Sequence, residues 1–196
     1  MKNLLLTVLF TSAIAISAAA ADNLPTPAIA VVEQATLDKS AALKSIVSQV
    51  EKKRAEVQKE MSKYEAELKA EDKKLSEEQS KLSEKDFAAK KQAFEKKVQG
   101  IQEKLEIRRV QMELAVEEAK KKVYEAFIKV ADQIKTEAGA NIILYKETIV
   151  TADKAFDLTD KVLDQLNKAL PSVQVVYKSE ADVKAQLMQS LQAQQK

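Results

Sequence analysis

Apolar residues recur at spacings of four and three along a long polar stretch, which is the pattern of a helix with one face against a partner helix. Residues 37–137 contain no proline and consist mainly of strong helix formers. In the first half of this stretch the apolar positions are Leu43, Val47, Val50, Val57, Met61, Tyr64, Leu68, Leu75 and Leu82. Arg54, Glu71 and Glu78 fall on the same face. We therefore expect the contact along this face to weaken toward residue 80.

The motif "KLSEKDFAAKKQAF", residues 81–94, predicts that the chain reverses direction. Ser83 precedes Asp86 by three residues, a capping box in which the serine oxygen accepts the Asp86 amide and a new helix begins at Glu84. Two amphipathic helices joined by a few polar residues pack antiparallel, so we expect a helical hairpin with its tip near residues 82–86. The alternative is one unbroken rod, because Ser and Asp also occur within helices. The apolar positions of the second helix are Phe87, Phe94, Val98, Ile101, Leu105, Met112, Val116, Ala119, Val123, Phe127, Val130 and Ile134.

Gly100 lies inside the second predicted helix. A glycine there costs roughly 1 kcal/mol relative to alanine. One interpretation gives the residue no role. The other makes it a flexing point of the arm, and predicts that Gly100→Ala would stiffen it.

Basic residues outnumber acidic ones in the distal part of the predicted hairpin, with nine Lys and Arg against five Asp and Glu in residues 80–109. Such a run is either a solvated helix face or a surface that attracts lipopolysaccharide, anionic lipid or acidic clients in a salt-sensitive way. The candidate contacts are Lys96, Lys97, Arg108 and Arg109.

Short segments with strand-like composition flank the helical stretch. Residues 28–33 ("AIAVVE"), 142–145 and 148–151 are predicted strands, and Gly139 is predicted to close the second helix. Strands far apart in the sequence would then pair at the base of the hairpin. Because three short strands make a marginal sheet, we expect several chains to associate there.

The segment "AFDLTDKVLDQLNKALP", residues 155–171, predicts a short helix that Asp157 or Thr159 caps. Asp157 and Asp160 also have the spacing of paired carboxylates for acid-base catalysis. Two caps at a helix start explain them without any chemistry, and we prefer that interpretation.

Residues 171–196 form a C-terminal extension. Its first part, "SVQVVYK", has the composition of a further strand. Ser179 and Asp182 form a second capping box ahead of a final helix with a glutamine-rich end. The pattern does not indicate what this extension does.

The first 21 residues have the layout of a cleaved export signal. Lys2 precedes an apolar run over residues 4–16, and the small residues 19–21 precede Asp22, where the mature chain would begin. The alternative is a membrane anchor, but the apolar run is short for one. We expect an exported protein that no later segment anchors in a bilayer.

Composition narrows the function further. The chain is 32% charged and 5% aromatic with both signs interspersed, which is typical of long exposed helices. It has no Cys, no His and two glycines, so thiol nucleophiles, Ser-His triads, the usual zinc sites and glycine-rich phosphate loops are excluded. A net charge of +2 gives no field that would attract nucleic acid. We predict no enzymatic activity, no cofactor and no nucleic-acid partner.

Taken together, these segments resemble the Skp/OmpH family of periplasmic chaperones. The resemblance rests on the export signal, "AIAVVE", a hairpin that turns near "LSEKD", "ANIILYKETIV" and "DLTDKVLDQLN". It covers residues 28–168, and the chain beyond residue 168 goes past it.

The resemblance implies a periplasmic homotrimer whose strands form a body and whose hairpins project as tentacles around a cavity. Such a protein holds unfolded outer-membrane proteins without ATP. Family members also contact lipopolysaccharide through basic residues of the second tentacle helix, and Arg108 and Arg109 lie in a comparable region, although the full basic pattern is not reproduced. Small apolar side chains beside mixed charges, such as Ala115 and Ala119, suit many weak contacts to an unfolded chain.

The predicted fold is thus mainly α with a small β body, in which a long antiparallel helical hairpin emerges from short strands that assemble in an oligomer. Residues 22–36 and 139–170 would form the body and residues 37–138 the hairpin. The main alternative function is a structural coiled-coil spacer or adaptor of the cell envelope that binds one folded partner. A third is a surface adhesin that lies on anionic lipid.

Overall fold

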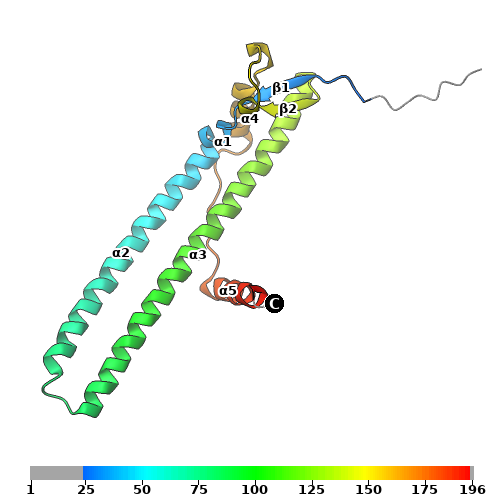
Figure 1. The fold of residues 1–196 in the computed structure, drawn as a ribbon. Helices are drawn as coiled ribbons and strands as arrows, with labels where there is room; N and C mark the ends of the chain where they lie inside the picture. The colour runs from blue at the N-terminus through cyan, green and yellow to red at the C-terminus, as the bar shows by residue number, and fades with distance from the viewer. Residues whose placement is uncertain (1–23, 195–196) are drawn as a thin grey trace, which may run out of the picture.

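The structure, a computed structural model, describes residues 24–194. The predicted export signal at residues 1–21 lies outside this range. Figure 1 shows a long helical hairpin with a small body at one end and a further helix beside it. In chain order the elements are β1 (Ile29–Val32), α1 (Thr36–Lys39), α2 (Ala41–Glu78), α3 (Glu84–Glu137), β2 (Ile142–Tyr145), the 3₁₀ turns η1 (Lys146–Thr148) and η2 (Lys154–Phe156), α4 (Thr159–Ala169) and α5 (Glu180–Gln194).

The hairpin consists of α2 and α3, which have 38 and 54 residues and are therefore about 57 and 81 Å long. They reverse direction between Glu78 and Glu84. At the start of α3 the Ser83 hydroxyl oxygen accepts the Asp86 amide at 3.2 Å and donates to the Asp86 carboxylate at 2.7 Å. The hairpin is confirmed, and the alternative of one unbroken rod is wrong.

The body is built around a two-stranded parallel sheet. β1 pairs with β2 in the register Ile29 to Ile142 and Val32 to Tyr145. Parallel strands need a long crossover connection, and here the whole hairpin is that connection. On the other side of β1 the Leu158 amide donates to the Val31 carbonyl at 2.8 Å, which places the start of α4 against the sheet.

Two of the predicted strands are wrong. Thr148 is the last residue of the turn η1, residues 149–151 pair with no strand in the described chain, and Val150 is fully exposed. Residues 172–178 are extended, but they pair with neither β1 nor β2. Their backbone is bound by side chains of the hairpin instead.

Local signals end and start the helices. Gly139 has φ 70°, and the Ala140 amide donates to the Lys135 carbonyl at 3.0 Å, so the predicted glycine cap of α3 is confirmed. The predicted first helix is interrupted at Ser40, whose extended backbone separates α1 from α2. Its hydroxyl oxygen accepts the Leu43 amide at 3.2 Å and so caps α2.

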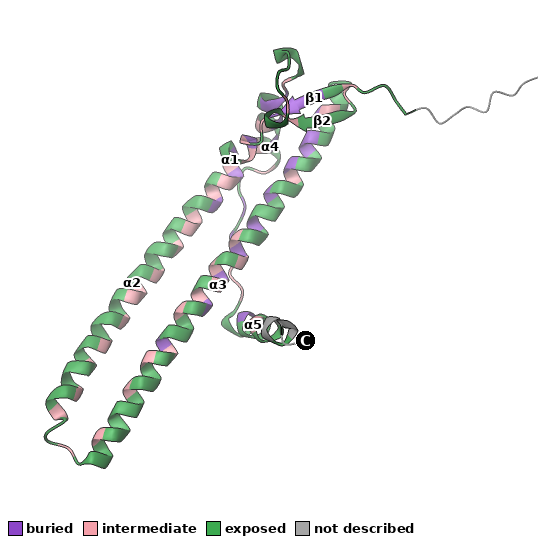
Figure 2. Cartoon of the chain, viewed as in Figure 1, coloured by how far each residue is buried: buried purple, intermediate pink, exposed green. Residues whose placement is uncertain are grey.

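Buried side chains form two clusters toward the body end of the hairpin. Figure 2 shows the buried residues as purple ribbon on the body and along the part of α3 nearer to it. The first cluster joins the sheet, α3 and α4, and contains Ala30, Val32, Phe127, Val130, Ile134, Leu158, Val162 and Leu166. The second joins α2, α3 and the C-terminal extension, and contains Ala42, Ile46, Ala115, Ala119, Val123, Val173 and Val175.

The buried face of α3 differs from the predicted one in its middle part. Leu105, Met112 and Val116 are only half-buried, whereas Ile107, Gln111 and Ala115 are buried. The reason is that the C-terminal extension covers a second face of α3. On α2 the predicted stripe is half-buried, apart from Val47, which is 50% exposed.

Within residues 24–194, no helix combines the length and the apolar character that crossing a bilayer requires.

Candidate functional site

A hollow of about 810 Å³ lies between the two arms of the hairpin. Charged side chains from both helices surround it, among them Arg54, Arg109 and Glu117. Its apolar lining comes from both predicted stripes and consists of Val50, Val57, Met61, Leu105, Met112 and Val116. An apolar floor with mixed charges at its rim suits weak contacts with a polypeptide better than the exact fit of a small ligand.

The distal half of the hairpin has no apolar core. In the described chain, no residue of α2 beyond Ile46 and no residue of α3 before Ile101 is buried. Figure 2 shows the same contrast, with exposed and half-buried ribbon toward the tip. A second hollow, of about 290 Å³, opens between the arms beside Leu75 and Phe94. The arms thus approach each other here without closing.

Ion pairs link the arms in this distal half. The Lys97 ammonium lies 2.6 Å from the Glu71 carboxylate, and Lys90 pairs with Glu78. The hydrogen bond that Lys97 donates to Glu71 raises the pKa of the lysine. Glu71 and Glu78 are two of the charges that interrupt the predicted apolar stripe. They are half-exposed, so water and salt screen the pairs and the arms are held weakly.

Most of the predicted basic contacts are occupied within the chain. Lys97 pairs with Glu71 as above, and Arg109 lies 2.7 Å from Glu106 and 3.2 Å from Glu113. The structure places Arg108 3.2 Å from Glu180 of α5 and 3.8 Å from Glu60.

Lys96 is different, because it is exposed and forms no ion pair within residues 24–194. The four predicted cations therefore do not form one free basic surface. The side chains of Lys97, Arg108 and Arg109 would have to leave their carboxylates before they could bind an anionic head group.

Gly100, the predicted flexing point, lies within the continuous helix α3. A methyl group at its Cα would meet no heavy atom within 4 Å. Packing therefore does not require a glycine here, and flexibility of α3 at this residue stays a prediction.

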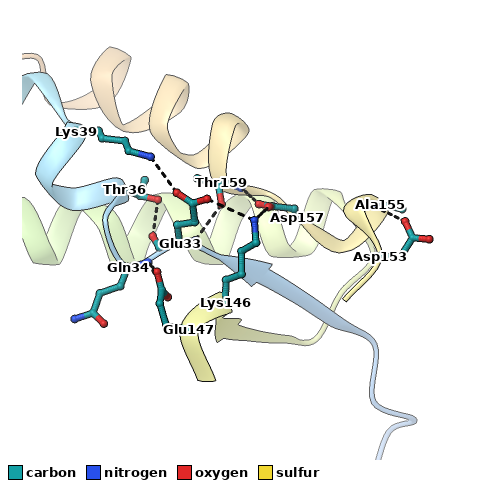
Figure 3. A network of polar contacts seen from close by, with 10 residues as sticks. All are labelled: Glu33, Gln34, Thr36, Lys39, Lys146, Glu147, Asp153, Ala155, Asp157 and Thr159. Carbon is teal, nitrogen blue, oxygen red and sulfur yellow. Dashed lines mark hydrogen bonds and ion pairs between the residues drawn. The ribbon is translucent and has the colours of Figure 1, made fainter. Parts of the chain in front are cut away.

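The body contains a network of polar contacts that Figure 3 shows. The Lys146 ammonium lies 2.8 Å from the Asp157 carboxylate, and the Glu33 amide donates to the Thr159 hydroxyl at 3.0 Å. Lys39 contacts the Glu33 carboxylate at 3.0 Å, and this hydrogen bond lowers the pKa of Glu33. The network joins β1, the turn after β2 and the start of α4, so its role is structural.

Asp157 is ionised throughout the neutral pH range. Its hydrogen bond with Lys146, supported by those with Thr159, lowers its pKa to about 2. The Asp157 carboxylate also accepts the amide of Thr159, the first residue of α4, at 3.0 Å. The predicted Thr159 cap is wrong, because Leu158 is at the N-cap position and the Thr159 hydroxyl accepts the Glu33 amide instead. Asp160 is exposed and outside the network. A carboxyl group with so low a pKa is a poor proton donor, which favours capping over acid-base chemistry.

Sequence reasoning missed the side chains that bind the C-terminal extension. Ser45 and Gln49 of α2 and Gln111 of α3 form hydrogen bonds with backbone atoms of residues 173–178. The available signal was Gln111, a polar residue in a row with Ala115 and Ala119 at helical spacing.

No group of three or more acidic, His or Cys side chains that could hold a metal ion occurs in the described part of the chain.

Comparisons with known proteins agree with this fold. The family model described as outer membrane protein (OmpH-like) matches residues 28–166. A solved structure from Caulobacter crescentus, described as a "putative outer membrane chaperone (OmpH-like)", has a TM-score of 0.72 and 17% sequence identity. The match covers 80% of this chain and 94% of that one. No curated protein sequence matches the chain. The extension after α4 lies beyond the residues that the family model matches.

Proposed function

The chain belongs to the OmpH-like family, and from this premise we propose that it is a holdase chaperone of the periplasm. It binds unfolded outer-membrane proteins along its hairpin without ATP and keeps them from aggregating. The Caulobacter protein with the same fold is described as a "putative outer membrane chaperone", which supports this proposal.

The observation that carries the proposal is the open apolar hollow between two loosely joined arms. Its lining residues, such as Val57 and Met112, are half-buried and remain in reach of a second polypeptide. Because the distal arms are linked by screened ion pairs, they can separate at small cost and admit clients of different size. Many weak contacts let a client leave without nucleotide hydrolysis.

Exposed apolar side chains of the body support self-association, which fits the same function. Apolar side chains on and around the sheet are exposed in the single chain, namely Ile29, Ile142, Leu144, Val150 and Phe156. A two-stranded sheet with such a surface is marginal alone. We therefore propose that bodies of several chains, most simply three, pack together and arrange their hairpins around a shared cavity. Light scattering of the mature protein measures this directly, and a mass of three chains is expected.

An aggregation assay tests the chaperone activity. A urea-unfolded outer-membrane barrel protein is diluted into buffer with the mature chain, and turbidity is followed. We expect suppression that is weakened in a Val57→Asp, Met112→Asp variant of the hollow, and retained in the matched control Val47→Asp, which lies on the exposed side of α2. A folded chain that suppresses no aggregation would contradict the proposal. If it instead bound one folded partner at fixed stoichiometry, it would be a structural spacer.

A further inference from the structure

Residues 172–178 occupy a groove on the hairpin in the manner of a bound β-strand. Val173 and Val175 are buried and Tyr177 is half-buried, whereas Gln174 and Val176 between them are exposed. This alternation is that of an extended chain with one face on a surface. The groove floor comes from both arms and consists of Ala42, Ile46, Ala115, Ala119 and Val123.

Side chains of the hairpin bind the backbone of this segment. The Gln49 side-chain amide donates to the Val173 carbonyl at 2.7 Å and accepts the Val175 amide at 3.0 Å. The Ser45 hydroxyl accepts the Val173 amide at 3.1 Å, and the Gln111 side chain donates to the Lys178 carbonyl at 2.6 Å. Every polypeptide offers the same backbone groups. The groove therefore recognises an extended conformation, and its small alanines select apolar residues at alternate positions.

The fit of the segment is incomplete. The Tyr177 hydroxyl is buried and has no hydrogen-bond partner among the described residues. A buried hydroxyl without a partner reduces the stability of the contact that buries it. The contact of residues 172–178 with the groove is therefore less stable than it would be with a partner for this hydroxyl, which favours a competing polypeptide.

Helix α5 tethers the segment to the hairpin. It contacts α3, and Figure 1 shows the two helices beside each other. Val183 of α5 is fully buried. Lys184 lies 2.7 Å from Glu103, and Glu180 lies 3.2 Å from Arg108. A tether on each side, α4 and α5, keeps the segment at high effective concentration beside the groove.

We infer that this groove is a binding site for extended polypeptide with apolar residues at alternate positions, and that residues 172–178 are its resident competitor. Strands of outer-membrane barrels have this alternation, because one face meets lipid and the other the lumen. A client strand displaces the segment when it binds more tightly than the tethered copy. The inference rests on the proposed chaperone function and names how the hairpin recognises its clients.

The test uses the full mature chain and a fluorescent peptide with the sequence of residues 171–179 as the probe. The variant Val173→Asp, Val175→Asp should release the segment and bind the peptide at least tenfold more tightly than the wild type. Val176→Asp is the matched control, because Val176 is 61% exposed on the same segment, and it should bind as weakly as the wild type. Adding Gln49→Ala to the double variant should remove most of the gain.

Hydrogen exchange decides what each outcome means. In the double variant the amides of residues 173 and 175 should exchange freely while helicity stays unchanged. Free exchange without tighter peptide binding would overturn the inference. Unchanged protection would also overturn it, because docking would then not depend on the alternate apolar residues.

A measurement on the wild type covers the case that the double variant does not fold. Addition of an unfolded barrel protein should deprotect residues 172–178, and client binding without deprotection contradicts the inference. Failure of the proposed function looks different, since no variant would then suppress aggregation. The peptide measurement uses no client and would still decide on the groove.

Discussion

The two ends of the hairpin are stabilised by different physical means. At the body end, side chains such as Leu166 and Val123 are buried in two apolar clusters, and the polar network around Asp157 is well connected. Toward the tip, no residue of the described arms between Ile46 and Ile101 is buried. Ion pairs such as Lys97–Glu71 link the two arms there instead. Apolar burial contributes far more free energy than exposed ion pairs.

The difference separates holding the fold from binding a partner. A firmly packed base keeps the arms attached and oriented. Arms that lose little free energy when they separate can adjust to an unfolded polypeptide. The following changes would break or sharpen this contrast.

The largest effect is expected from Leu166→Ala in the body. This side chain is fully buried, so its truncation should lower the free energy of unfolding by about 3 kcal/mol. The matched change Leu75→Ala in the half-buried distal stripe should cost less than about 1 kcal/mol. Urea unfolding followed by circular dichroism at one protein concentration measures both. Equal losses would remove the contrast between the two ends.

Asp157→Asn should lower stability at pH 7 by about 1–2 kcal/mol, because the ionised carboxylate is stabilised in the folded state. The folded-state pKa of about 2 lies below the ordinary aspartate value of 3.8. Its contribution is therefore present above about pH 4 and is lost as the pH falls toward 2. Unfolding curves of wild type and variant should converge over that window. Asp160→Asn, in the first turn of α4 but outside the network, is the control and should cost less stability at pH 7 than Asp157→Asn.

Gly100→Ala should stabilise the distal part of α3 by about 0.5–1 kcal/mol, since alanine favours a helix and the added methyl group meets no atom within 4 Å. Slower hydrogen exchange around residue 100 would measure the gain. Gly139→Ala is the control with the opposite sign, because its φ of 70° strains any residue with a side chain. If Gly100 is a flexing point, the range of distances between the arms is also narrower in the Gly100→Ala variant than in the wild type.

The smallest effect is expected from Lys97→Glu, which replaces the attraction to Glu71 by repulsion. Spin-label distances between the arms should broaden, and the broadening should shrink at high salt. The further change Glu71→Lys restores the pair and should restore the distribution. A distance distribution that stays the same in both variants would show that this ion pair does not link the arms.

Local signals predicted much of this architecture. The Ser83–Asp86 pair placed the reversal, and Gly139 placed the end of α3, because each acts within a few residues. The strands at 29–32 and 142–145 were also predictable, since β-branched runs beside helix ends leave few alternatives.

What depends on distant contacts was not predictable. The strand expected at residues 148–151 does not form, because the chain turns at η1, which includes Thr148, and residues 149–151 pair with neither β1 nor β2. The buried face of α3 shifts to Ile107, Gln111 and Ala115, because a segment from the far end of the sequence covers it. Hydrogen bonds between Gln49 and that segment join residues more than 100 positions apart, a spacing that no local pattern encodes.

The most direct measurement compares distances across the arms at two heights in one protein. The chain has no cysteine, so Cys pairs introduced at exposed positions can be spin-labelled uniquely, one pair at Lys44 and Glu125, nearer the body than the hollow, and the other at Lys69 and Gln99. Dilution with unlabelled protein restricts the signal to single chains. We predict a narrow basal distribution that an unfolded barrel protein leaves unchanged, and a broad distal one that shifts when this client is added. Basal and distal distance distributions of equal width, both unchanged when the client is added, would contradict the account.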